Sequence, residues 1–162
     1  MRVFTAAFTV VPATSCTDLW EFVPAPGYVN KIRRIVISGV QTTGSSMLFK
    51  LIKRSTAASG GTSTNAAIIN QGEIDGASAA PNARVKVYTA NPTVGTSIGV
   101  VREIRVPIPA PSTTILGIVY INFDIDGNEG LILQGNEFLC GNFNGVSMSG
   151  GSISVNIDFV EG

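Results

Sequence analysis

The segment Ser152-Ile-Ser-Val-Asn-Ile-Asp-Phe-Val160 decides the fold class of this chain. Every second residue in it is apolar, and Ser154, Asn156 and Asp158 occupy the positions between. An alternation of period two places all apolar side chains on one face of an extended strand, whereas a helix needs a period near 3.6. The segment therefore predicts a β-strand that buries one face and exposes the other.

Similar runs recur along the whole sequence at short spacing. Met47, Phe49 and Leu51 alternate with polar neighbours, and glycine or proline interrupts nearly every longer stretch. No window combines a helical stripe with capping residues, which excludes a helical domain. The predicted strands cover residues 3–11, 18–23, 29–38, 47–54, 84–90, 100–108, 114–123, 131–134, 137–142 and 152–160, with a hairpin turn at Asp126-Gly127-Asn128. We predict one all-β domain over residues 1–162, an antiparallel β-sandwich of the jelly-roll type.

Residues 55–83 form the one segment without a clear strand pattern. They are rich in Ser, Thr, Gly and Ala, and only residues 66–69 read as a possible short strand. A loop of this length is unusual in a compact domain unless it has a function. We expect a long loop that neighbouring molecules hold in place.

The charges of the chain are balanced in number but sorted along its length. All 11 Lys and Arg residues lie at or before Arg105, whereas six of the 11 carboxylates follow it. Only 14% of the residues are charged, against about 25% in an average domain. A neutral, weakly charged chain is poorly protected against self-association, so this pattern favours a building block that contacts ordered neighbours.

The sequence lacks the residues that several kinds of catalytic and binding site need. The chain has no histidine, which removes the usual general base and most transition-metal sites. Ser147 lacks the glycine pattern of a nucleophile elbow, and the glycines at 60 and 61 lack the lysine of a phosphate loop. The basic residues between Lys31 and Arg54 are not interleaved with exposed aromatic residues, as nucleic-acid-binding sheets require. We expect no enzyme, no cofactor and no direct nucleic-acid partner.

Three features leave alternatives open. Asp124, Asp126 and Asn128 could bind a structural cation, although an Asp-Gly turn explains them more simply. Cys16 and Cys140 are interpreted as free thiols, with a disulfide as the alternative. Trp20 and Tyr28 favour core positions, and exposed rings would instead suit sugar binding.

The compartment follows from what the sequence lacks. No run reaches the roughly 18 apolar residues of a membrane helix, and the N-terminal run resembles a strand more than a cleaved signal peptide. We expect cytoplasmic synthesis and no membrane contact.

Short motifs at both ends and in the middle resemble one family. They are Phe4-Thr-Ala-Ala-Phe8, Asp18-Leu-Trp-Glu-Phe22 followed by Pro24-Ala25, Ser59-Gly-Gly-Thr62, Gly95-Thr96, and the ending from Ser149-Gly-Gly to Asp158-Phe-Val-Glu161. With these, the chain is similar to the head decoration or cement proteins of bacteriophages. The resemblance implies a non-enzymatic virion component on the outer surface of the capsid. Its partners would be the major capsid protein and further copies of itself, for example in a trimer.

The contact residues predicted for that role come from the N-terminal segment and the basic strands. They are Met1, Arg2, Val3, Arg33, Arg34, Lys50 and Arg54. Two other functions stay open at this point: a phage tail or baseplate component, and a carbohydrate-binding β-sandwich.

Overall fold

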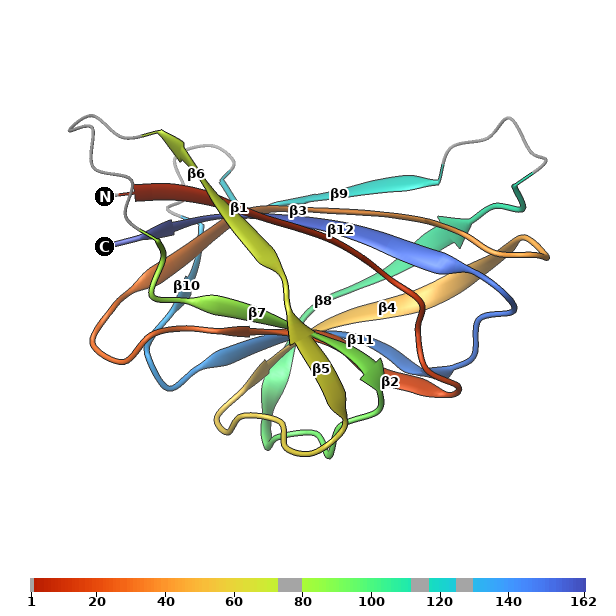
Figure 1. The fold of residues 1–162 in the computed structure, drawn as a ribbon, viewed down its shortest axis with the longest axis horizontal. Coiled ribbons are helices and arrows are strands. Elements are labelled where there is room, and N and C mark those ends of the chain that lie inside the picture. The colour runs from red at the N-terminus through yellow and green to blue at the C-terminus, as the bar shows by residue number, and fades with distance from the viewer. Residues whose placement is uncertain (1, 73–79, 112–116, 125–129) are drawn as a thin grey trace.

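The structure of this chain is a computed structural model that describes residues 2–72, 80–111, 117–124 and 130–162. Two antiparallel sheets lie face to face, as the upper and lower layers of Figure 1 show. The described residues contain strands and turns and no helix. The prediction of an all-β antiparallel sandwich is confirmed.

Within the described residues, each sheet has six strands. Sheet A has the order β10 (Leu131–Leu133), β3 (Asn30–Val40), β12 (Ser152–Glu161), β1 (Arg2–Val10) and β6 (Ala67–Gly72), and β9 (Ile118–Asn122) pairs with β3 beyond the end of β10. Sheet B has the order β5 (Thr62–Asn65), β7 (Arg84–Ala90), β2 (Cys16–Val23), β11 (Phe138–Val146), β4 (Ser45–Arg54) and β8 (Ser97–Ile108). Consecutive strands from β1 to β4 alternate between the sheets, so the chain crosses the sandwich repeatedly.

Residues 55–83 differ from the sequence-based expectation of a loop with one short strand. They contribute two strands, β5 on one edge of sheet B and β6 on one edge of sheet A. Ser, Thr and Ala have low hydrophobicity, so the segment lacks the apolar alternation that identifies a strand in the sequence. Pairing of its backbone with β7 and β1 supplies the order instead. Residues 73–79 of this segment lie outside the described residues.

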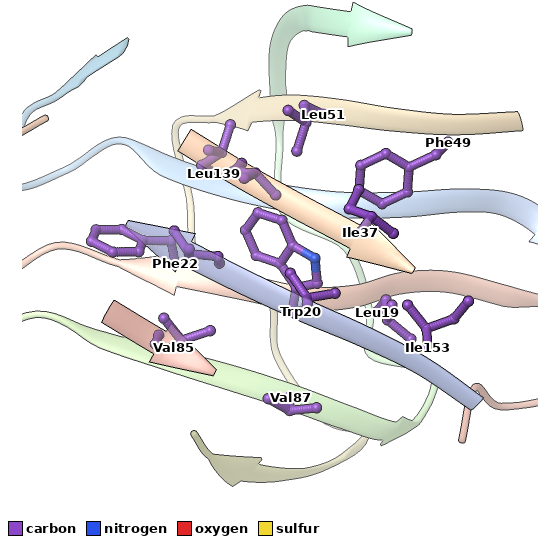
Figure 2. Close-up of a cluster of buried hydrophobic side chains, with 14 of the residues drawn as sticks. Leu19, Trp20, Phe22, Ile37, Phe49, Leu51, Val85, Val87, Leu139 and Ile153 are labelled. Carbon is purple, nitrogen blue, oxygen red and sulfur yellow. The ribbon is translucent and has the colours of Figure 1, made fainter. Parts of the chain in front are cut away.

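The core lies between the two sheets and is built by the predicted alternation. The four alternating apolar residues of β12, from Ile153 to Phe159, are buried, and Phe159 packs edge-on against Phe22 of the opposite sheet with ring centroids 4.9 Å apart. Figure 2 shows Trp20 at the centre of this cluster, between Leu139, Leu19 and Phe22. Its indole ring is fully buried, so the prediction of a core position for Trp20 is confirmed.

Two predicted elements are only partly described. The predicted strand at 114–123 is present from Ile118 to Asn122, and residues 112–116 lie outside the described residues. The predicted hairpin turn at 126–128 lies outside them too.

Candidate interaction surface

The face of sheet A that points away from sheet B, here called the outer face, carries few charges. Strand registers align its outward side chains in rows across β9, β3, β12, β1 and β6. The rows are Asn122, Arg34, Asp158, Thr5 and Ile69; then Tyr120, Val36, Asn156, Ala7 and Ala67; then Ile118, Ser38, Ser154 and Thr9. These rows hold one base and one acid, which pair with each other at 2.6 Å. These three rows therefore form a broad, electrically neutral part of the outer face.

Two hollows indent the outer face. The first, of about 320 Å³, is lined by Val3, Arg33, Arg34, Gln71, Asn122, Asp124 and Asp158. The second, of about 190 Å³, is lined by Ser38, Gly39, Val40, Gly117, Ile118, Ser152 and Ser154. Arg34 and Ser38 stand four residues apart on β3, so the hollows are separated by roughly 13 Å along the strands.

A β-bulge gives the first hollow its two arginines. The β3–β12 register shifts between Asp158 and Phe159, which pair with Arg34 and Ile32, so Arg33 is the extra residue. A bulge lets two consecutive side chains leave the alternation of a strand, and both arginines are exposed as a result. The backbone carbonyl of Arg33 accepts a hydrogen bond from Phe123 at 2.8 Å, which fixes the bulge against the neighbouring segment.

Each arginine of the first hollow is held by one carboxylate. Arg33 Nε donates to Asp124 Oδ2 at 2.7 Å, and Arg34 Nε donates to Asp158 Oδ2 at 2.8 Å. Thr5 Oγ1 donates to the other oxygen of Asp158 at 2.6 Å. The hollow is thus balanced in charge and rich in hydrogen-bonding groups, which suits polar side chains of a partner better than a free anion.

The sorting of charge along the sequence is resolved largely within the molecule. Basic residues of the N-terminal half pair with acids of the C-terminal half, as in Arg33–Asp124, Arg34–Asp158 and Lys53–Glu137. The basic strands therefore do not need acidic groups from other molecules for charge balance, because antiparallel pairing of distant segments supplies those acids. Exposed pairs of this kind add little stability, typically 0–1 kcal/mol.

The seven predicted contact residues do not form one surface. Arg2 and Val3 start β1 in sheet A, the sheet that also carries Arg33 and Arg34. Lys50 instead lies on β4 in sheet B, where it pairs with Glu103 at 3.4 Å. Met1 lies outside the described residues.

Arg54 is buried, so the prediction that it contacts a partner is wrong. The pairing of β4 with β11 is regular from Lys50 to Arg54, so Arg54 stays on the same face of the strand as Lys50, and contacts with distant residues bury it. Its guanidinium donates to Asp18 Oδ1 and to the carbonyl of Gly95, both at 2.8 Å. A second donor, Asn142 Nδ2, reaches the same Asp18 oxygen at 2.7 Å.

A second buried carboxylate, missed in the sequence, lies on β2 beside this pair. Glu21 accepts hydrogen bonds from the backbone of Ala58 at 2.7 Å and from Tyr88 Oη at 3.1 Å. Lys86 lies 3.5 Å from it. With Arg54 and Gly95, these contacts fasten segments 55–61 and 91–96 to sheet B. The sequence signal for this buried site was the alternation of polar residues along β2, but the same pattern is equally typical of a strand face exposed to solvent.

Both cysteines are free and buried, as predicted. Burial raises the pKa of the Cys16 thiol from 9.0 to about 11, and the nearby Asp18 carboxylate adds to the shift. Burial also raises the pKa of Cys140, as do the charges of Asp18 and Glu21. These thiols are protonated and inert near neutral pH.

The remaining alternatives depend on Asp124 and the aromatic residues. Asp124 is engaged by Arg33, Asp126 and Asn128 lie outside the described residues, and the described part of the chain holds no cluster of three metal-binding side chains. Trp20 cannot stack on a sugar because it is buried, whereas Tyr28 is 41% exposed. No helix within the described ranges has the length and hydrophobicity for crossing a membrane.

Comparison with known proteins finds no relative of this chain. No family model, no curated protein and no solved structure matches the chain.

Proposed function

We propose that this chain is a non-enzymatic bacteriophage decoration protein that binds the outer surface of the capsid and stabilises the shell. One observation carries the proposal. Elements that the sequence singled out as contacts converge on the first hollow: Val3 from the N-terminal segment, Gln71 from segment 55–83, and the two arginines of β3. The motif resemblance to cement proteins supports the same role.

The mechanism would be mechanical. A rigid sandwich seated across two shell subunits adds apolar burial worth roughly 25 cal/mol per Å², and it resists their separation under the pressure of packaged DNA. The first hollow would receive polar side chains of the major capsid protein, with the ends of β1 and β6 beside it. A surface balanced in charge binds without the cost of stripping water from unpaired ions.

The order of the strands supports the finer assignment to the jelly-roll class. The run β1-β12-β3-β9 in one sheet and β2-β11-β4-β8 in the other is the order that a folded-over ribbon of paired strands produces. In this interpretation β5, β6 and β7 are an insertion between β4 and β8. The insertion extends both sheets at one side of the sandwich and supplies Gln71 to the hollow.

Co-sedimentation tests the proposal directly. The purified chain is mixed with empty capsids of the phage that carries its gene, and bound chain is measured in the pellet. Saturable binding with a fixed number of copies per capsid, together with greater resistance of the capsids to heating, is the expected result. A chain that stays in the supernatant at micromolar concentrations would remove the proposal.

The other virion role is a tail or baseplate component. Mass spectrometry of separated heads and tails distinguishes it, since a decoration protein is found with heads. Of the two aromatic residues considered for carbohydrate binding in the sequence, Trp20 is buried and only Tyr28 is exposed.

A further inference from the structure

The outer face of sheet A presents an exposed ring and, next to it, the second hollow. Tyr120 is 59% exposed and lies at the end of its row, on the edge strand β9 beside Val36. The second hollow begins one row further along the strands, at Ile118 and Ser38. A large exposed aromatic residue on a neutral, flat face is the typical anchor of a protein interface.

The chemistry of the second hollow matches that of a tyrosine side chain. Val40 and Ile118 provide apolar walls for a ring, and both are about two-fifths exposed. Ser38, Ser152 and Ser154 surround them with hydroxyl groups that can hydrogen-bond a phenol. The hollow carries no charged residue, so an arginine or a carboxylate would be a poor occupant.

We infer that two copies of this chain pair through the outer faces of their A sheets, each inserting Tyr120 into the second hollow of the other. A two-fold axis lying in the plane of contact, between the row of Tyr120 and the row of Ser38, brings each ring opposite the other copy's hollow. The rows nearby contain no unpaired charge that this packing would bury. Other parts of the described surface with exposed apolar residues, such as the β8 edge at Ile98 and Val100, adjoin charged residues at 102, 103 and 105.

The area of the outer face is sufficient for a small dimer interface. Five strands about 4.8 Å apart and about six residues of strand length give a contact roughly 20 Å by 20 Å in projection on each copy. Because side chains make the surface uneven, the accessible area buried is larger than this projected area, and it is near the lower end of the areas buried in specific protein interfaces. The pairing is reciprocal and gives a dimer rather than the trimer expected from the sequence. The inference concerns the free chain: the contact reaches the row of Arg34, which also lines the first hollow, so pairing of two copies and the proposed capsid contact exclude each other.

Sedimentation velocity of the purified chain over a range of concentrations tests the dimer. Tyr120→Ala should raise the dimer dissociation constant at least about 30-fold, the effect of losing an anchor aromatic residue. Ser38→Arg, which fills the hollow with a charged side chain, should do the same. Tyr28→Ala is the matched control, because that tyrosine is also exposed but precedes β3 and lies outside the rows; it should leave the dimer unchanged.

Mixing the two disruptive variants tests reciprocity. The Tyr120→Ala chain keeps an intact hollow and the Ser38→Arg chain keeps its tyrosine, so their mixture can form one of the two ring contacts. The mixture should therefore associate more strongly than either variant alone, with circular dichroism confirming that both are folded. A monomeric wild-type chain at 100 µM or above, a Tyr120→Ala variant that dimerises like wild type, or a mixture no more associated than its components would overturn the inference.

Discussion

Replacing Arg54 by methionine should destabilise the fold strongly, although a methionine matches much of its length. Asp18 is fully buried, and Arg54 supplies one of the two donors to its Oδ1 atom. Breaking a buried ion pair by removing one partner costs about 3–5 kcal/mol, because the remaining charge stays uncompensated. The carbonyl of Gly95 also loses its guanidinium donor, which costs about 1 kcal/mol more. We expect a loss of about 4 kcal/mol in the free energy of unfolding.

Urea unfolding followed by circular dichroism measures this loss. With a slope of about 2 kcal/mol per molar urea for a chain of this size, the midpoint should fall by about 2 M. Arg34→Met is the matched control: its side chain is 52% exposed in its ion pair, so its removal should cost at most about 1 kcal/mol. The double variant Asp18→Asn with Arg54→Met should lose less than the sum of the single losses, since the pair is removed together. Equal midpoint shifts for Arg54→Met and Arg34→Met would refute the assignment of Arg54 to a buried pair.

Two further predictions concern the core and its titrating groups. Gly141→Ala should lower the melting temperature by about 3–10 °C, because its Cβ would lie 2.3 Å from Trp20 Nε1 and overpack the core. Gly99→Ala, with nothing within 4 Å of the new Cβ, should leave the melting temperature nearly unchanged. Equal effects of the two substitutions in calorimetry would contradict this packing. The free energy of unfolding should be independent of the Cys16 thiol below pH 9 and fall as the pH rises from 9.0 toward 11, because the unfolded chain releases that proton first while the folded chain retains it. Urea midpoints measured across this pH range test whether stability falls. The buried Cys140 and Tyr88 should act in the same direction, because their pKa values are also raised. A stability that rises with pH would disprove the prediction.

The sequence predicted the sandwich well because period-two patterns report burial on one face directly. β12 and the first part of β4 follow that pattern, and their apolar residues are buried as expected. The pattern does not identify a strand where backbone pairing, and not burial of side chains, orders the chain. Strand β5 consists of small or polar residues and β6 has only Ile68 and Ile69 as large apolar residues, so pairing with β7 and β1 orders them.

The contact surface was predictable only in part, because bulges change the direction of side chains. Arg54 is buried by contacts with residues distant in the chain, Asp18 and Gly95, while the register shift at Arg33 brings two neighbouring arginines to one hollow. No sequence period identifies such a shift in advance. The pairing of basic and acidic halves is likewise a property of the antiparallel topology, which brings together Arg34 and Asp158, 124 positions apart in the sequence.

A comparison of capsid occupancy by two charge-reversed variants tests the central claim most directly. Arg33→Glu changes the first hollow, whereas Lys50→Glu breaks an exposed pair in the other sheet, and each removes one surface ion pair of small energetic weight. The proposed function predicts that Arg33→Glu abolishes co-sedimentation with capsids while Lys50→Glu binds as wild type does. Equal occupancy by Arg33→Glu and wild type would contradict the claim that the chain meets the capsid through this hollow.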